Sequence, residues 1–237
     1  MVVKMSRPNL NSLPENERLT LVSLILQYVT PEIVEEHRNA ALSGAHSDPV
    51  LFLSFHRRYI GGLEGFLQEQ GYPHWVPLPS WNPEEPIPEE FNIPNTGPGQ
   101  LENLNPNVSF SPQFDPENLA NYETVEELGA AIIPLHNLVH RRIGGIMNDM
   151  FRAPEAPIFW PFHSFIDDIW WNWQRITVVV PSCIGLNIDE AQRKLHYFGL
   201  RLITKKNKPF PTWQRIRFQN PPSKSVIPYK TFVKLFF

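Results

Sequence analysis

The sequence has little cysteine and little charge. A single cysteine among 237 residues excludes an internal disulfide, a zinc ribbon and a cysteine-held iron–sulfur centre. Charged residues make up 19% of the chain and the formal net charge is −3, so we expect no nucleic-acid partner. No apolar run reaches the roughly 18 residues that span a membrane, and the first residues lack the apolar core of a signal peptide. We therefore expect a soluble cytoplasmic protein, with export by another route left open.

Proline and aromatic residues are abundant instead. The chain holds 25 prolines, 16 phenylalanines and seven tryptophans, and 42% of its residues are hydrophobic. That apolar fraction is enough for a packed core. The prolines exclude a coiled coil or a simple helical bundle over the whole length, because proline breaks helices in their interior.

The charges are distributed unevenly. Residues 1–176 carry 10 Lys and Arg against 22 Asp and Glu, whereas residues 177–237 carry 11 against two. This switch predicts two domains, 1–176 and 177–237. The basic second domain is suited to bind an anionic surface or to dock on the acidic first domain.

Apolar spacing predicts helices in the first domain. Residues 14–42 indicate one or two helices with a break at Pro31. Three further helical stretches cover residues 50–70, 123–146 and 162–175, and the third of the four ends at Gly144-Gly145.

Between the second and third helical stretches lies a proline-rich segment. Residues 71–118 hold 11 of the 25 prolines, which excludes regular structure. Trp75, Trp81 and Phe91 need burial, so we expect a long ordered loop rather than a linker.

The second domain has a mixed pattern. Residues 187–200 indicate a short amphipathic helix that ends at Gly199. Four apolar or alternating runs around it predict short strands: TVVV, RLITKKN, QRIRFQ and TFVKLFF.

Six of the eight histidines form two groups of three. His136 and His140 are four residues apart in a helical stretch, so both imidazoles lie on one face and can bind one metal ion. His163 follows in the next helical stretch, with Asp167 at the position of a carboxylate that orients a metal-bound imidazole. His37, His46 and His56 form the upstream group. Imidazoles without cysteine are typical of copper, zinc or iron sites.

Two segments around these histidines carry a family resemblance. AHSDPVLFLSFHRRYIGGLEGFL and LHNLVHRRIGGIMNDMFRAPEAPIFWPFHSFIDDIW resemble the copper A and copper B regions of tyrosinases. The resemblance implies a mainly α fold, a four-helix bundle with long proline-rich loops. It implies two copper ions, copper A on His37, His46 and His56, and copper B on His136, His140 and His163.

The sequence departs from the family pattern in three places. The family usually has two adjacent histidines where this chain has Phe162 and His163, and the metal ligand is the second. Ala156 replaces an aspartate that often precedes PIFW. Some members link a copper A histidine to a cysteine, whereas the lone Cys183 lies in the second domain.

The resemblance also implies a function. It predicts a dicopper phenol oxidase that uses O2 to hydroxylate monophenols in the ortho position and to oxidise o-diphenols to o-quinones. Glu127 and Asn137 stand at the positions that we expect to hold a proton-accepting water, and Arg141 is expected at the substrate entrance. Four aromatic residues are expected to line or support the pocket: Phe55, Phe159, Trp160 and Phe162.

Other functions remain open at this stage. A catechol or o-aminophenol oxidase without hydroxylase activity has the same histidines, as does a non-catalytic oxygen-binding protein of haemocyanin type. A cell-wall binding protein with an inactive dicopper domain is a further alternative.

The second domain resembles a single PASTA domain, a small α+β fold. VVVPSCIGLNIDEAQRKLHYFGLRL and QNPPSKSVIPYKTFVKLFF carry this resemblance. It implies peptidoglycan as a possible partner, with a structural cap as the alternative. The direct connection at Arg175-Ile176-Thr177 favours docking on the catalytic domain over free tethering.

Overall fold

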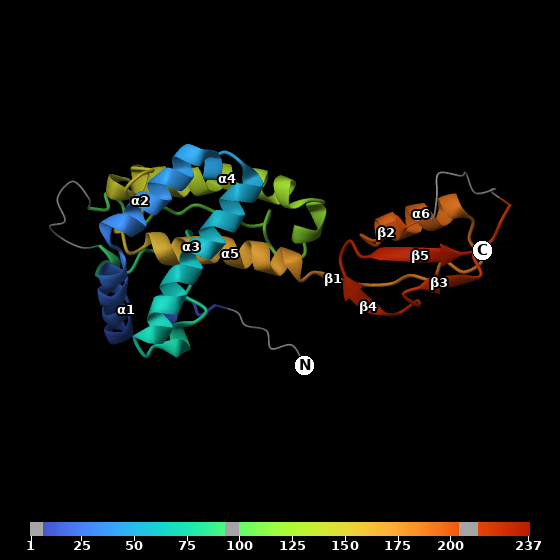
Figure 1. The fold of residues 1–237 in the computed structure, drawn as a ribbon, viewed down its shortest axis with the longest axis horizontal. Helices are drawn as coiled ribbons and strands as arrows, with labels where there is room; N and C mark the ends of the chain where they lie inside the picture. The colour runs from blue at the N-terminus through green and yellow to red at the C-terminus, as the bar shows by residue number, and fades with distance from the viewer. Residues whose placement is uncertain (1–6, 93–99, 204–212) are drawn as a thin grey trace. The chain divides into compact units, whose positions relative to one another are not determined.

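The computed structural model describes residues 7–92, 100–203 and 213–237. The chain divides into two compact units: Met1–Asp115 with Thr124–Trp170, and Pro116–Glu123 with Trp171–Phe237 (Figure 1). The C-terminal unit is therefore larger than residues 177–237. It includes residues 116–123 from the middle of the chain. No change in composition along the sequence indicates that this segment belongs to the C-terminal unit.

The first unit is built from helices, as the apolar spacing predicted. Pro31 separates the first two of them, and Gly144 ends the fourth. The helices are α1 (Glu15–Tyr28), α2 (Pro31–Ala40), α3 (Pro49–Glu69), α4 (Val125–Ile143) and α5 (Phe159–Gln174), of which the last continues into the second unit. No described helix has the length and hydropathy needed to cross a bilayer.

Local capping explains where the two long helices begin. Asp48 precedes α3, and its carboxylate accepts hydrogen bonds from the amides of Val50 and Leu51 at 2.9 and 2.8 Å. The Thr124 hydroxyl accepts from the amide of Glu127 at 3.1 Å at the start of α4. Such caps satisfy helix N–H groups that have no partner within the helix.

Two glycines end α4 and reverse the chain. Gly144 and Gly145 have φ values of +71° and +57°, a region that suits glycine. A Cβ atom at Gly145 would meet the carbonyl oxygen of Gln100 at 1.6 Å. The return of the chain after α4 therefore depends on a residue without a side chain.

Short helical turns connect the main elements. A π-helical turn at Ala41–Ala45 links α2 to α3, with Gly44 at φ +95°. Single 3₁₀ turns occupy Leu10–Ser12, Pro73–Trp75, Glu89–Phe91, Leu119–Asn121, Gly145–Asn148 and Ala153–Glu155.

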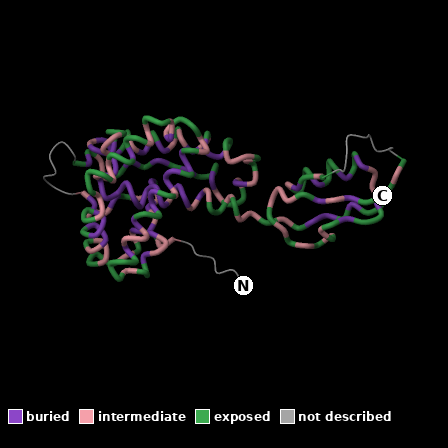
Figure 2. Tube along the Cα trace, viewed as in Figure 1, coloured by how far each residue is buried: buried purple, intermediate pink, exposed green. Residues whose placement is uncertain are grey.

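The proline-rich segment is an ordered loop over its described residues, as predicted. Trp81 and Phe91 are fully buried and Trp75 is 2% exposed, and buried stretches recur along this part of the tube in Figure 2. The loop thus supplies large apolar side chains to the core of the first unit.

The C-terminal unit combines one helix with five short strands. Helix α6 (Ile188–Tyr197) begins with a capping box between Asn187 and Glu190. Strand β1 (Thr177–Val179) pairs with β4 (Val226–Pro228), and the order of the other sheet is β2 (Arg201–Ile203), β5 (Phe232–Phe236), β3 (Phe218–Asn220). The sequence did not predict β4, and residues 204–207 of the predicted RLITKKN strand lie outside the described residues.

A separate core holds the C-terminal unit together. Cys183, Ala191, Leu195 and Val233 are fully buried in it. Cys183 is a free thiol there, and burial raises its pKa. Its place in this core agrees with the expectation that it forms no link to a histidine. The PASTA assignment itself stays a prediction.

Residues 116–123 belong to this unit through specific hydrogen bonds. The Tyr122 carbonyl accepts from the Lys230 ammonium at 2.5 Å and from the Trp173 indole at 3.0 Å. The Tyr229 hydroxyl donates to the carbonyl of Ala120. The Lys230 ammonium also lies 4.6 Å from the centre of the Trp173 ring, a favourable cation–π distance.

Candidate metal centre

The first unit gathers six imidazoles in two groups of three. The nitrogen atoms of His37, His46 and His56 that can bind a metal lie within 4.8 Å of one another, and the same holds for His136, His140 and His163. Helix α2 supplies His37, α3 supplies His56, α4 supplies His136 and His140, and α5 supplies His163. His46 follows the turn after α2. The structure thus brings together both groups that the sequence indicated.

The two groups touch each other. The rings of His56 and His163, one from each group, stack with centres 4.4 Å apart. His46 and His136 have ring centres 6.1 Å apart. Exposure is 3% or less for His37, His56, His136 and His163, so most of the site is shielded from water.

Hydrogen bonds at Nδ1 set the orientation of the rings. Nδ1 of His56 pairs with the carbonyl of Phe52 at 2.7 Å, and Nδ1 of His163 pairs with the carbonyl of Phe159 at 2.8 Å. Both acceptors lie one helical turn earlier. A carbonyl only accepts, so each Nδ1 carries the proton and each Nε2 is left as a bare lone pair.

Helix α4 uses other acceptors for the same purpose. Nδ1 of His140 pairs with the carbonyl of Met147 at 2.5 Å, which the Gly144-Gly145 turn brings back toward the helix. Nδ1 of His136 pairs with Oδ1 of Asn137 at 3.0 Å. These contacts direct both Nε2 atoms toward the group.

The bare nitrogens fit bound metal ions. Nε2 of His46, His56 and His140 are buried and have no hydrogen-bond partner among the described residues, and neither does either ring nitrogen of His37. Nε2 of His136 and His163 face each other at 3.1 Å although both are acceptors. Such an arrangement is unfavourable unless a cation lies between the lone pairs. The six donors therefore fit a dicopper site.

Burial keeps the imidazoles uncharged. Desolvation lowers the pKa of His46 and of His140 to about 4. Desolvation, followed by the proximity of His46, lowers the pKa of His37 to about 2. The pKa values of His56, His136 and His163 are also lowered well below 6.5, mainly by desolvation. A neutral imidazole is the form that binds a metal.

Asp167 does not orient His163, contrary to the sequence prediction. Its two carboxylate oxygens accept from Arg7 at 2.7 Å and from Arg57 at 2.5 Å. The backbone carbonyl of Phe159 orients His163 in place of the Asp167 carboxylate. Because Arg57 follows His56 in α3, Asp167 instead joins α3 to α5 behind the histidines.

The four predicted aromatic residues surround the imidazoles without lining the cavity. Phe159 lies 3.9 Å from the ring of His163, and Phe162 stacks on His136 with centres 5.7 Å apart. Phe55 packs on His56 at 5.1 Å. The Trp160 indole donates to the carbonyl of Pro154 at 3.1 Å. Their role is to support the rings and exclude water.

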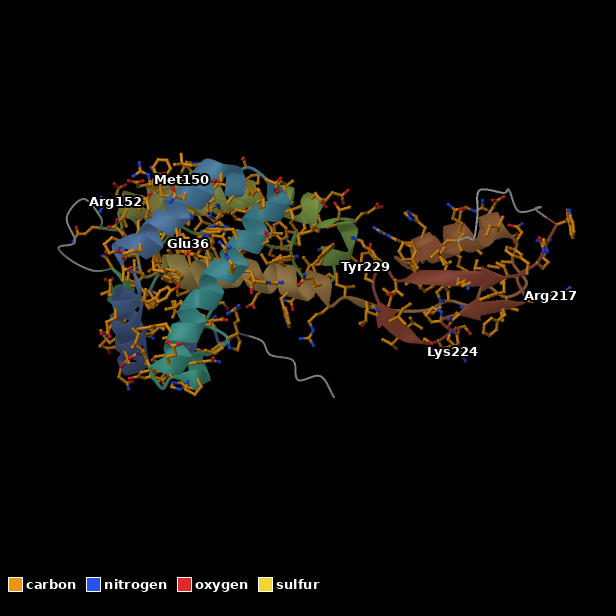
Figure 3. All side chains as sticks on the ribbon, in the orientation of Figure 1. Glu36, Met150, Arg152, Arg217, Lys224 and Tyr229 are labelled. Atoms are coloured by element: carbon orange, nitrogen blue, oxygen red, sulfur yellow. The ribbon has the colours of Figure 1, made fainter. Side chains whose placement is uncertain are left out.

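A cavity of about 270 Å³ opens beside the histidines. Asn137 and Arg141 line it, and both are exposed. The remaining lining residues are His37, His46, His136, His140, Met147, Asn148, Met150 and Ala153; Figure 3 marks Met150.

Glu127 lies away from this cavity. It is exposed in the first turn of α4 and is not a lining residue. Nine residues of helix separate it from His136, a rise of about 13.5 Å. Asn137 lines the cavity and Glu127 does not, and the role of Glu127 as part of a water-holding pair stays a prediction.

Sequence reasoning missed the residues that follow α4. Met147, Asn148 and Met150 line the cavity, and the Met147 carbonyl orients His140. The glycine pair was read as a helix end. After it, the chain passes so close to Gln100 that a Cβ at Gly145 would clash, and no local pattern shows this approach.

The buried neutral histidines predict acid sensitivity of the metal-free protein. The unfolded chain binds protons near pH 6.5, whereas these groups stay neutral in the folded state down to about pH 4 or below. Stability is therefore complete above pH 6.5 and falls as the pH decreases toward 4, by up to about 1.4 kcal/mol per pH unit for each buried imidazole. Urea unfolding of the metal-free protein at pH 7.5, 6.0 and 5.0 checks this. Equal midpoints at the three pH values would contradict it.

Comparisons with known proteins agree with this geometry. The common central domain of tyrosinase matches residues 102–176. The chain is 44% identical over 70 residues to a tyrosinase of Streptomyces lincolnensis, which covers 27% of this chain and 25% of that protein. It is 44% identical over 43 residues to a tyrosinase of Streptomyces antibioticus, covering 18% of this chain and 15% of that protein.

A fungal relative gives a similar result. Tyrosinase P of Aspergillus terreus is 41% identical over 39 residues, covering 16% of this chain and 11% of that protein. No solved structure matches the chain. The alignments span about a quarter or less of the length of these relatives. The family match and the two buried histidine groups together support a tyrosinase-like type-3 copper protein.

Proposed function

We propose that the protein is a dicopper phenol oxidase that oxidises o-diphenols to o-quinones with O2. The observation that carries this proposal is the convergence of six neutral imidazoles in two abutting groups of three. Group A, His37, His46 and His56, would hold one copper ion, and group B, His136, His140 and His163, the other. Bound copper would supply the redox chemistry, passing two electrons from the diphenol to oxygen.

The residues of the chain prepare the site for this chemistry. The carbonyls of Phe52, Phe159 and Met147 hold the Nδ1 protons of three imidazoles, so that neutral ligands face the metals. Asn137 accepts from His136, and we propose it as a positioning residue at the cavity wall. The buried rings of Phe55, Phe159, Trp160 and Phe162 pack around the imidazoles and shield them from water.

The cavity composition favours diphenol oxidation over monophenol hydroxylation. Its described lining contains no carboxylate, so a bound phenol with a pKa near 10 finds no acidic side chain there to accept its proton. A catechol deprotonates more readily and depends less on such a base. Hydroxylation of monophenols is the second candidate, and the tyrosinase match at 102–176 supports it.

The open cavity also favours an enzyme over an oxygen carrier. Exposed Arg141 and Met150 at its wall show that it reaches the surface. A protein that only binds O2 needs no opening of this kind for an aromatic substrate.

One assay tests the proposal. Copper-loaded protein is given 4-methylcatechol and 4-methylphenol side by side, and quinone formation and O2 uptake are recorded. We expect one O2 to be consumed for every two catechols oxidised. The rate on the phenol should be at least about 10²-fold lower, which is the loss of rate expected when a general base is missing. Reversible O2 binding without quinone would identify a carrier. Comparable rates on both substrates would favour the hydroxylase.

Arg141 predicts a preference among substrates. It has no hydrogen bond or ion pair with the described residues, and no carboxylate among the described lining residues offsets its charge. We expect Arg141→Gln to lower kcat/KM for 3,4-dihydroxyphenylacetate about fivefold relative to that for 4-methylcatechol. This loss corresponds to about 1 kcal/mol, the upper end of what an exposed charge pair contributes.

The neighbouring arginine provides a matched control. Arg142 is also exposed on α4 and does not line the cavity. Arg142→Gln removes the same charge and should leave the ratio of the two substrates within about twofold. If both variants change the ratio equally, the selectivity comes from the net charge of the unit rather than from Arg141.

A further inference from the structure

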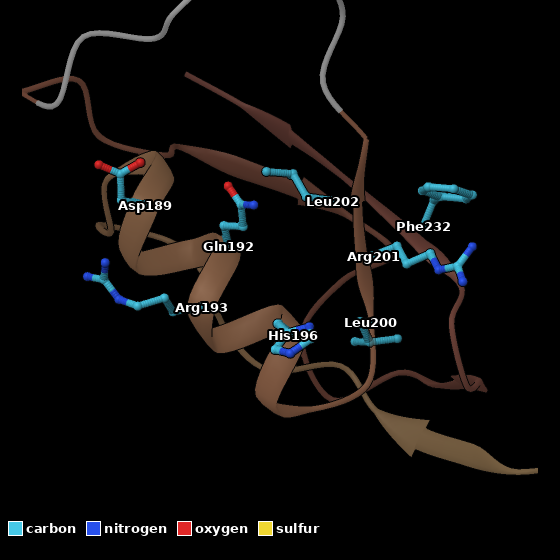
Figure 4. A pocket seen from close by; sticks show the side chains of 8 residues that line it. All are labelled: Asp189, Gln192, Arg193, His196, Leu200, Arg201, Leu202 and Phe232. Atoms are coloured by element: carbon cyan, nitrogen blue, oxygen red, sulfur yellow. The ribbon is translucent and has the colours of Figure 1, made fainter. Parts of the chain in front are cut away.

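The C-terminal unit contains a cleft that the proposed oxidase chemistry does not use. It has a volume of about 790 Å³, within the range of ligand-binding clefts. It lies between helix α6 and strand β2 (Figure 4). Its lining residues are Asp189, Gln192, Arg193, His196, Leu200, Arg201, Leu202 and Phe232.

One face of α6 forms the first wall of the cleft. Asp189, Gln192, Arg193 and His196 are spaced by three and four residues, so they lie on the same side of the helix. Figure 4 shows Gln192 directed into the space between the helix and β2. This wall is polar, with one acid beside one permanent cation and a histidine.

Strand β2 and the start of β5 form the other wall. Leu200, Leu202 and Phe232 provide apolar surface. The Arg201 guanidinium lies 6.0 Å from the centre of the Phe232 ring. Arg201 and Phe232 are register partners on one face of the sheet and point away from α6 in Figure 4, whereas Leu202 packs on the α6 side. The cleft thus has a cation on each face at the edge of β2, Arg193 on the α6 side and Arg201 on the other.

Among the described residues, no strand pairs with the outer edge of β2. Strand β2 ends the sheet order and pairs in parallel only with β5. The amide of Arg201 donates to Thr231 at 3.1 Å on the β5 side. Backbone groups alternate in direction along a strand, so the N–H and C=O of Leu202 point away from β5. They have no partner among the described residues, and such an edge is a template for another strand.

We propose that the cleft binds an extended peptide segment rich in carboxylates, which adds as a strand to the free edge of β2. The main-chain groups of Leu202 would pair with the peptide backbone, as in other cases of strand addition. Because alternate side chains of a strand point to opposite faces, apolar side chains of the peptide would cover Leu200 and Leu202 on the α6 side. Its carboxylates would meet Arg201 on the other face, with Arg193 contributing attraction from the α6 side.

The charge of the surrounding domain supports an acidic occupant. Residues 177–237 carry 11 Lys and Arg against two Asp and Glu. This excess attracts anions of every kind. An amide edge beside apolar side chains favours a peptide over a sugar polymer or a nucleic acid, because only a peptide backbone pairs with a strand edge along its length.

The experiment measures binding to the full-length protein and needs no enzymatic activity. Three fluorescein-labelled peptides are compared by anisotropy in 150 mM salt: Val-Glu-Val-Glu-Val-Glu, its Glu→Gln form, and the acidic form with alternate amides N-methylated. We expect the acidic peptide to bind at least about tenfold tighter than either of the others. Hydrogen exchange at residues 200–203 should slow only with the acidic unmethylated peptide.

Two double variants distinguish binding in the cleft from non-specific electrostatic attraction. Arg193→Gln with Arg201→Gln should weaken binding of the acidic peptide about tenfold. Arg217→Gln with Lys224→Gln removes the same charge from exposed positions of the unit outside the cleft (Figure 3) and should weaken binding less than about twofold.

Several results would overturn the proposal. Equal weakening in both double variants would show a non-specific basic surface. Equal affinity for the N-methylated peptide, or full competition by an anionic polysaccharide without protection of residues 200–203, would exclude strand addition. No binding at millimolar peptide would exclude the site. None of these results bears on diphenol oxidation, which is measured separately.

Discussion

The packing of six uncharged imidazoles against one another, four of them buried, is the constraint on which the first unit depends. Nδ1 of His56, His140 and His163 donates to a backbone carbonyl. Nε2 of His56 and of His140 then has no partner among the described residues, and Nε2 of His163 faces only the Nε2 acceptor of His136. Bound metal ions would satisfy the remaining lone pairs, which makes this otherwise unfavourable arrangement acceptable to the fold.

The scaffold keeps the rings in place through contacts one layer further out. Asp167 bridges Arg57 and Arg7, whose guanidinium also pairs with Glu64 at 2.6 Å. Helix α3, helix α5 and the N-terminal segment are thereby tied together by buried charges. Removing one member of such a network costs about 3–5 kcal/mol because the others lose their partners. The positions of His56 and His163 follow from these ties and from the aromatic packing around them.

Local patterns predicted the helices, most strands and the two histidine groups, and they failed where distant segments meet. The spacing of His136 and His140 was sufficient because a helix fixes both rings. Asp167 was assigned to His163 by the same helical spacing, yet distant Arg7 and Arg57 bind it more strongly. Glu127 stands nine residues before His136, about two and a half helical turns away, and it is not among the residues that line the cavity. Residues 116–123 join the C-terminal unit through Tyr229 and Lys230, contacts between segments more than 100 residues apart.

Metal analysis of the copper-reconstituted protein tests the central claim most directly. The account predicts two copper ions per chain in the wild type, about one in His140→Ala, because two imidazoles hold an ion weakly, and two in His74→Ala, since exposed His74 lies outside both groups. One copper or fewer in the wild type, or an equal loss in the two variants, would contradict it.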